Sequence, residues 1–147
     1  MWFEVIVKDA DKEIKLSLPC EEQELKDSYT IVSCENSWDY ENEDLTLKEL
    51  NNLAQDLQDI EDNGDEEWLA AYVDATNCDL SIAVDKYDTA TFYHDMDLID
   101  VAYDIVDEDF HCPESLKNFI DYDYRAFAEY LGNNGYHETI YGTIVIQ

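Results

Sequence analysis

The sequence is poor in positive charge. Its 147 residues hold 8 Lys and Arg against 37 Asp and Glu, a formal net charge of −29. Proteins that bind DNA, RNA or an anionic membrane surface directly neutralise phosphates with Lys and Arg, so this balance excludes these three partners. A net charge this large also destabilises a compact state by self-repulsion, which indicates that the charge is used. The expected partner is a basic protein or a cation.

Targeting and disulfide signals are also missing. The chain shows no positively charged leader before an apolar core, and no segment approaches the roughly 18 apolar residues of a membrane span. Its cysteines, Cys20, Cys34, Cys78 and Cys112, are widely spaced and form no C-x-x-C pair. We therefore expect a cytoplasmic protein with free thiols.

Signatures of catalysis are absent as well. The four glycines form no phosphate-binding loop, and no G-x-S-x-G motif occurs. His94, His111 and His137 lie far apart and outside any H-E-x-x-H pattern, although His111 and Cys112 are adjacent ligand types. The sequence predicts no enzyme, no cofactor and no metal centre.

One acidic stretch partly matches a calcium-binding loop. Counted from Asp59, it has Asn63 and Gly64 at suitable positions, but Glu61 at the third and Ala70 at the twelfth, where a bidentate Glu is required. The Asn-Gly pair already explains a turn, and acids suit the helix start that follows it. We interpret the stretch as a solvent-facing acidic turn between two helices.

The apolar residues, 46% of the chain, predict that it folds. Alternating patterns indicate an early sheet, with strands over residues 1–7, 13–18 and 29–34. Thr46 and Glu49 have the spacing of a capping box, and apolar residues at helical intervals predict a helix over residues 47–60. Further helices are expected after Asp65, after Asp79, over 98–108, from Pro113 and over 125–131. Residues 89–96 fit helix or strand, and the chain closes with a strand or hairpin.

These elements predict an α+β protein built as an elongated chain of three small domains. They are an N-terminal antiparallel sheet over residues 1–44, a helical bundle over 45–94 and a mixed helix and strand domain over 95–147. Charge supports the first boundary, because residues 49–147 hold only three of the eight basic residues.

Carboxylates recur every two to five residues on faces opposite the apolar stripes. Duplex DNA carries about one negative charge per 1.7 Å, so 29 charges correspond to roughly 50 Å of duplex, or about 15 base pairs. A rod of small domains reaches this length, whereas a compact globule has a radius of gyration of only about 15 Å. A merely solvated acidic surface remains the alternative.

Four ordered blocks resemble the ArdA antirestriction proteins: "LNNLAQDLQDIEDNGDEEWLAAYVDATNCDLSIAVDKYD", "LIDVAYDIVDE", "FIDYDYRAFAEYL" and "GYHETIYGTIVI". The resemblance covers roughly residues 45–147 and is poorer before them. It implies an elongated, curved molecule that dimerises through its C-terminal domain and imitates bent DNA. Members of this family occupy the DNA-binding groove of type I restriction-modification enzymes, which protects incoming mobile genetic elements.

The resemblance also implies site residues. The family's antirestriction motif maps onto Phe127, Tyr130, Leu131 and Tyr136, with Tyr130 and Leu131 as candidates for a homodimer interface. Ala126 or Ala128 stands where the family often has a second acid. We expect phosphate-mimicking carboxylates at Asp56, Asp59, Glu61, Asp62, Asp65, Glu66, Glu67, Asp74, Asp85, Asp97, Asp100, Asp104, Asp107, Glu108, Asp109, Asp121 and Asp123, which we call the carboxylate surface. The alternatives are an acidic chaperone or regulator of another basic DNA-binding protein and, less favoured, a cation-buffering protein.

Overall fold

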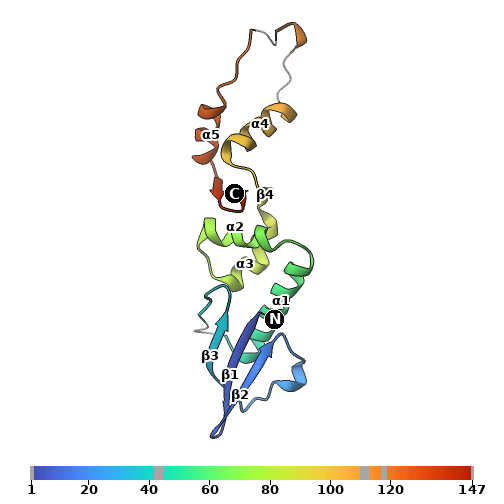
Figure 1. Ribbon diagram of the computed structural model, residues 1–147, viewed down its shortest axis with the longest axis vertical. Coiled ribbons are helices and arrows are strands. Elements are labelled where there is room, and N and C mark those ends of the chain that lie inside the picture. Colours follow the sequence, from blue (N-terminus) through green and yellow to red (C-terminus); the bar gives the residue numbers. More distant parts are fainter. Residues whose placement is uncertain (1, 42–44, 110–112, 117–118, 147) are drawn as a thin grey trace. The chain divides into compact units, whose positions relative to one another are not determined.

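The computed structural model describes residues 2–41, 45–109, 113–116 and 119–146. It is an α+β structure with two antiparallel sheets and five α-helices among these residues (Figure 1). Contacts between residues group the chain into two compact units, Met1–Asp65 and Glu66–Gln147. The three segments 1–44, 45–94 and 95–147 stay a prediction.

The first unit contains a three-stranded sheet in the order β2-β1-β3. Its strands are β1 (Phe3–Asp9), β2 (Lys12–Leu18) and β3 (Thr30–Asn36), and a 3₁₀ turn, η1 (Glu22–Glu24), lies between β2 and β3. In β1 every second side chain, from Phe3 to Val7, is buried, as expected for a sheet with one covered face. The three predicted strands are therefore confirmed within one to two residues at their described ends.

Helix α1 (Leu47–Asp62) completes this unit and contacts β2 (Figure 1). The predicted capping box forms: the Glu49 amide donates to Thr46 Oγ1 at 3.2 Å, and the Thr46 amide donates to Glu49 Oε1 at 3.2 Å. These two bonds satisfy backbone donors that a helix start otherwise leaves free. Beyond the helix, Gly64 adopts a φ of 81°, which suits the predicted Asn-Gly turn.

The second unit holds the remaining elements around a sheet in the order β4-β6-β5. In chain order these elements are α2 (Glu66–Thr76), α3 (Leu80–Lys86), η2 (Tyr87–Thr89), β4 (Thr91–His94), α4 (Leu98–Asp109), η3 (Glu114–Leu116), α5 (Tyr124–Gly132), β5 (Tyr136–Thr139) and β6 (Gly142–Val145). Helix α2 contacts all three strands, and α4 packs against α5 around buried Val101, Ala102, Ala128 and Leu131.

Two sequence expectations change on this structure. The ambiguous residues 89–96 contain strand β4, because β6 pairs with it from Thr91↔Val145 to His94↔Gly142. The helix predicted from Pro113 is replaced, among the described residues, by the single 3₁₀ turn η3: the Leu116 amide donates to the Pro113 carbonyl at 2.8 Å, an i→i+3 bond. The expected bundle of α1, α2 and α3 stays a prediction, since α1 belongs to the first unit and the other two to the second.

Candidate partner-binding surface

The carboxylate surface begins on α1. Asp56, Asp59, Glu61 and Asp62 are exposed there, and Asp65, just after the helix, is half-buried. The opposite side of α1 is covered, with Leu50, Leu53 and Leu57 among its buried side chains. This helix therefore shows acids to solvent because its apolar residues occupy the other face.

Neighbouring amides hold two of these acids. Gln55 Nε2 donates to Asp59 Oδ1, and Gln58 Nε2 donates to Asp62 Oδ1, both at 3.0 Å and both one turn apart. A neutral amide orients a carboxylate without cancelling its charge. The end of α1 thus presents fixed negative groups.

The second unit carries further members of the carboxylate surface on its first two helices. Glu66 and Glu67 are exposed in the first turn of α2, where the helix dipole favours negative charge, and Asp74 is exposed near its end. Asp85 is exposed on α3. The stretch that partly matches a calcium-binding loop is therefore divided between α1 and α2, and only residues 63–65 lie between the two helices.

Helix α4 carries the densest group of acids. Asp100, Asp107, Glu108 and Asp109 are exposed on it, and Asp104 is half-buried. Just before the helix, exposed Asp97 accepts a hydrogen bond from the Asp100 amide at 2.8 Å, while Asp100 accepts one from the Asp97 amide at 3.2 Å. Asp97 and Asp100 are therefore also local capping residues.

Two acids precede α5. Asp121 and Asp123 are both exposed, and Asp123 caps the helix by accepting a hydrogen bond from the Ala126 amide at 3.1 Å. This cap satisfies one of the free amides of the helix start, so Asp123 has a structural role in addition to its expected one.

The lysine–carboxylate pairs Lys15–Glu4 and Lys48–Glu22, at 3.3 and 2.6 Å, lie in the first unit. Neither contains a member of the carboxylate surface. Lys48 lowers the pKa of Glu22 by a hydrogen bond and by its charge, and Glu22 raises the pKa of Lys48 in return.

The acids of α4 contribute to a raised pKa at two neighbouring tyrosines. The pKa of Tyr93 is raised, first by burial and then by the nearby Tyr136 and the charges of α4. The pKa of Tyr124 is raised by loss of solvent and then by charges that include Asp107 and Asp121. Loss of solvent is the larger cause of both shifts, and the negative field of the acids, which disfavours ionisation of a phenol, adds to it.

The residues of the implied antirestriction motif occupy different environments. Tyr130 is 59% exposed, whereas Leu131 is only 4% exposed and packs in the core between α4 and α5. Phe127 is half-buried and stacks on Tyr130 with ring centroids 6.3 Å apart, and half-buried Tyr136 stacks on Tyr93 at 6.5 Å. Leu131 is thus occupied within its own chain, and Tyr130 is the motif residue whose surface is open to a partner.

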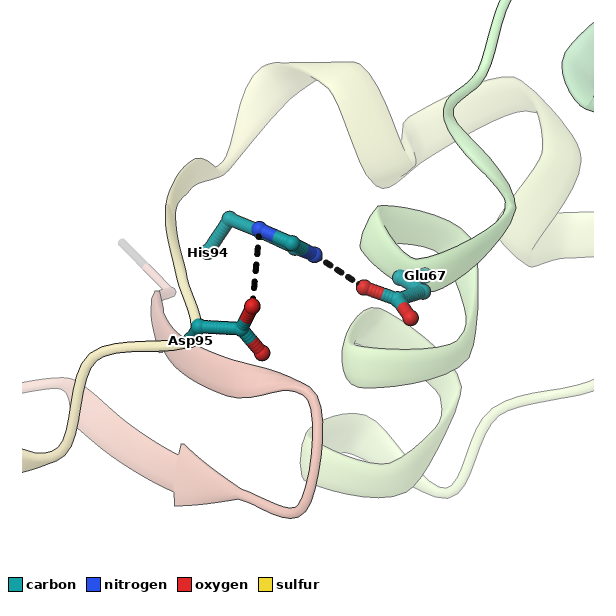
Figure 2. Close-up of side chains that lie close together, drawn as sticks. All are labelled: Glu67, His94 and Asp95. Carbon is teal, nitrogen blue, oxygen red and sulfur yellow. Dashed lines mark hydrogen bonds and ion pairs between the residues drawn. The ribbon is translucent and has the colours of Figure 1, made fainter.

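One cluster of three side chains is not predicted by any pattern in the sequence. Glu67 of α2, His94 at the end of β4 and Asp95 just after it lie together, with His94 Nε2 bonded to Glu67 and Nδ1 3.4 Å from Asp95 Oδ2 (Figure 2). All three are exposed. Glu67 and His94 are 27 positions apart, so no spacing motif signals the contact, although the adjacency of His94 and Asp95 is visible in the sequence.

The described cysteines Cys20, Cys34 and Cys78 are free, as predicted, whereas Cys112 and His111 lie outside the described residues.

The chain matches no protein-family model, and a search of the curated proteins finds no match to it. Within the described chain, no helix combines the length and apolar character needed to cross a membrane.

Proposed function

We propose that this protein is a DNA-mimic antirestriction protein, which binds the DNA-binding groove of a type I restriction-modification enzyme. The observation that carries the proposal is the exposure of the carboxylate surface: apart from half-buried Asp65 and Asp104, every member is exposed. These acids occur on both compact units, and those on α1 and α4 share their helices with buried apolar residues. Such an array offers a basic groove many anionic oxygens without offering it a nucleic acid.

The mechanism is electrostatic and breaks no bond, so the protein is not an enzyme. A groove that binds DNA is lined with Lys and Arg, and counterions are released when these residues meet phosphates. Carboxylates that take the place of phosphates release the same counterions. Attraction between the opposite charges also accelerates encounter, and it weakens with salt because screening acts over about 10 Å at 0.1 M.

The resemblance to ArdA proteins supports the finer parts of the proposal. They are an elongated arrangement of three small domains with the boundaries predicted above, a homodimer made through the C-terminal domain, and a cytoplasmic site of action. Tyr130 is the first residue to examine at the dimer contact, since it is the most exposed residue of the motif.

A competition experiment tests the proposal. The purified protein is titrated into a complex of labelled duplex DNA with a type I methyltransferase core, and displacement is followed by fluorescence anisotropy between about 50 and 200 mM salt. We expect the affinity of the protein for the core, obtained from the displacement and from the DNA affinity measured at each salt concentration, to weaken steeply as salt rises. An unrelated basic DNA-binding protein is the control complex.

Each result has a distinct meaning. An affinity of the protein for the type I core that does not change with salt contradicts the electrostatic mechanism. Displacement from the control complex alone contradicts the antirestriction function and favours the acidic chaperone or regulator of another DNA-binding protein. No displacement from either complex excludes DNA mimicry altogether.

A further inference from the structure

The Glu67–His94–Asp95 cluster differs from the rest of the acidic surface because it contains an imidazole. One ligand atom from each residue lies within 4.8 Å of the other two, and the two ring nitrogens each face a carboxylate (Figure 2). Among the described residues, this is the group of His, Cys, Asp and Glu side chains that meets this spacing.

The arrangement favours a bound cation. A ring nitrogen that carries no hydrogen offers a lone pair to a metal ion. Two carboxylates that lie this close to one imidazole also repel each other, and a cation bound between them removes that repulsion. The cluster is therefore a place where a cation removes a specific repulsion, beyond the general attraction of an acidic protein.

The backbone fixes the position of Asp95 in the chain, and neighbouring rings support the His94 imidazole. Asp95 adopts a φ of 56°, which Asp tolerates better than most residues, and its amide donates to the Tyr141 carbonyl at 3.0 Å. The His94 ring meets the Phe92 ring edge to face at 5.8 Å, and Phe92 stacks on Trp68 at 6.5 Å. The imidazole thus extends from a paired strand and rests on an aromatic stack.

We propose that Glu67, His94 and Asp95 bind a divalent transition-metal ion of the Zn²⁺ class. Imidazole nitrogen with carboxylate oxygen suits Zn²⁺, whereas Ca²⁺ and Mg²⁺ take oxygen ligands. The two carboxylates match the charge of the ion. Atoms bound to one tetrahedral Zn²⁺ lie about 3.3 Å apart, whereas the ligand atoms here lie within 4.8 Å of one another. Movements of about 1.5 Å or less in these exposed side chains therefore close the site.

The test is a calorimetric titration of the full chain with ZnCl₂, in excess Mg²⁺ so that diffuse counterion binding is already saturated. We expect one Zn²⁺ per chain and a change in Trp fluorescence, because Trp68 belongs to the aromatic stack under His94. Both His94→Ala and Glu67→Gln should weaken the affinity at least about tenfold. Circular dichroism confirms that each variant is folded.

Two matched variants distinguish Zn²⁺ binding at this site from the general attraction of an acidic protein for cations. Glu66→Gln removes the same charge one residue away, and His137→Ala removes another exposed imidazole of the same unit; both should bind Zn²⁺ as the unmodified chain does. Equal losses in Glu66→Gln and Glu67→Gln, or binding that never saturates, overturn the proposal. So does a thiolate charge-transfer band with Co²⁺, which would place the ion on cysteine. No restriction enzyme is present, so the result is independent of the proposed function.

Discussion

At the scale of single residues, Asn51 has a role that its polarity alone does not reveal. It is one of the buried polar side chains, and it joins α1 to the segment that follows β2: Oδ1 accepts from the Cys20 amide at 2.9 Å, and Nδ2 donates to the Cys20 carbonyl at 3.1 Å. A buried amide is tolerated here because its donor and its acceptor are both satisfied.

Replacing this side chain should destabilise the first unit. We expect Asn51→Ala to lower the free energy of unfolding by about 1–3 kcal/mol, since two hydrogen bonds are lost and the Cys20 backbone groups lose their partners. Urea denaturation followed by circular dichroism measures the change. Asn52 is the matched control because it is adjacent and exposed, and Asn52→Ala should stay within about 0.5 kcal/mol. Equal losses in the two variants would show that the Cys20 contacts contribute nothing.

The thiols of the first unit should react slowly. Burial raises the pKa of Cys20, with the charge of Glu24 adding to it, and burial also raises the pKa of Cys34. Only the thiolate is nucleophilic, so iodoacetamide at pH 8 should modify both more slowly in the folded chain than in urea. Site-resolved mass spectrometry checks the two rates.

The same shifts set the sign of a stability effect. A raised pKa in the folded state means that folding favours the neutral thiol. The resulting contribution to the free energy of unfolding is fully present below the thiol pKa of the unfolded chain, about 8.5. It is lost as pH rises through the thiol pKa of the folded chain. The folded-state rate of alkylation should therefore climb with pH above 9. Equal rates in folded and unfolded chains at pH 8 would contradict the assignment.

The sequence predicts side-chain contacts best where the two partners are close along the chain. Thr46 and Glu49 are three positions apart, and their predicted capping box is present. His94 stands in no ligand-spacing motif, and Glu67 comes close to it only because α2 packs on the second sheet. A local signal therefore predicted the cap but could not predict the cluster.

At the scale of elements, Gly142 permits the close approach of β6 to β4. It has a φ of 142°, and a Cβ atom there would lie 2.3 Å from the Tyr93 carbonyl oxygen and 2.9 Å from the Asp95 amide nitrogen. Both obstacles are backbone atoms, which cannot rotate away. We expect Gly142→Ala to destabilise the second unit by about 3 kcal/mol or more, because the strands must separate.

Thermal unfolding of Gly142→Ala beside Gly132→Ala tests this expectation. At Gly132, the last residue of α5, a Cβ would meet only the Leu98 Cδ1 atom at 3.3 Å, the end of a flexible side chain. This control should change stability by less than about 1 kcal/mol. If Gly142→Ala were as mild as the control, β4 and β6 would be less tightly paired than the structure shows.

Elements were predictable where periodicity and packing agree. Strand β1 alternates buried and exposed side chains, and α1 buries its whole apolar stripe, so both were placed from pattern alone. The segment after Pro113 has apolar residues, but Leu116, Phe119 and Ile120 are all exposed. Without a core to cover, those residues gain little from helix formation, because tertiary packing supplies most helical stability.

At the scale of the whole molecule, hydrophobic periodicity predicts the α+β class and composition predicts an acidic surface, but neither says which elements contact each other. The boundary before α1 stays a prediction, and among the described residues α1 contacts β2 and belongs to the first compact unit. Which sheet a helix joins depends on contacts between residues far apart in sequence, such as that of Asn51 with Cys20. Single-chain periodicity carries no such information.

The proposed function predicts that binding is shared among many charges. An exposed charge pair contributes about 0.5 kcal/mol, so Asp107→Asn alone should weaken binding to a type I methyltransferase core by only about two- to threefold. Neutralising Asp104, Asp107, Glu108 and Asp109 together should remove about 2 kcal/mol, or about thirtyfold in affinity at low salt, and should flatten the salt dependence. Anisotropy competition at two salt concentrations measures both effects.

The matched control removes four exposed acids from outside the carboxylate surface, Asp11, Glu13, Glu21 and Glu24, and therefore changes the net charge equally. If position matters, this control block should slow association slightly through long-range attraction and leave dissociation unchanged, since a rim charge acts mainly on the on-rate. Equal losses from the two blocks would mean that net charge alone drives binding, as for an acidic chaperone. Complete loss from Asp107→Asn alone would instead indicate one defined pocket, which an imitation of a continuous phosphate backbone does not have.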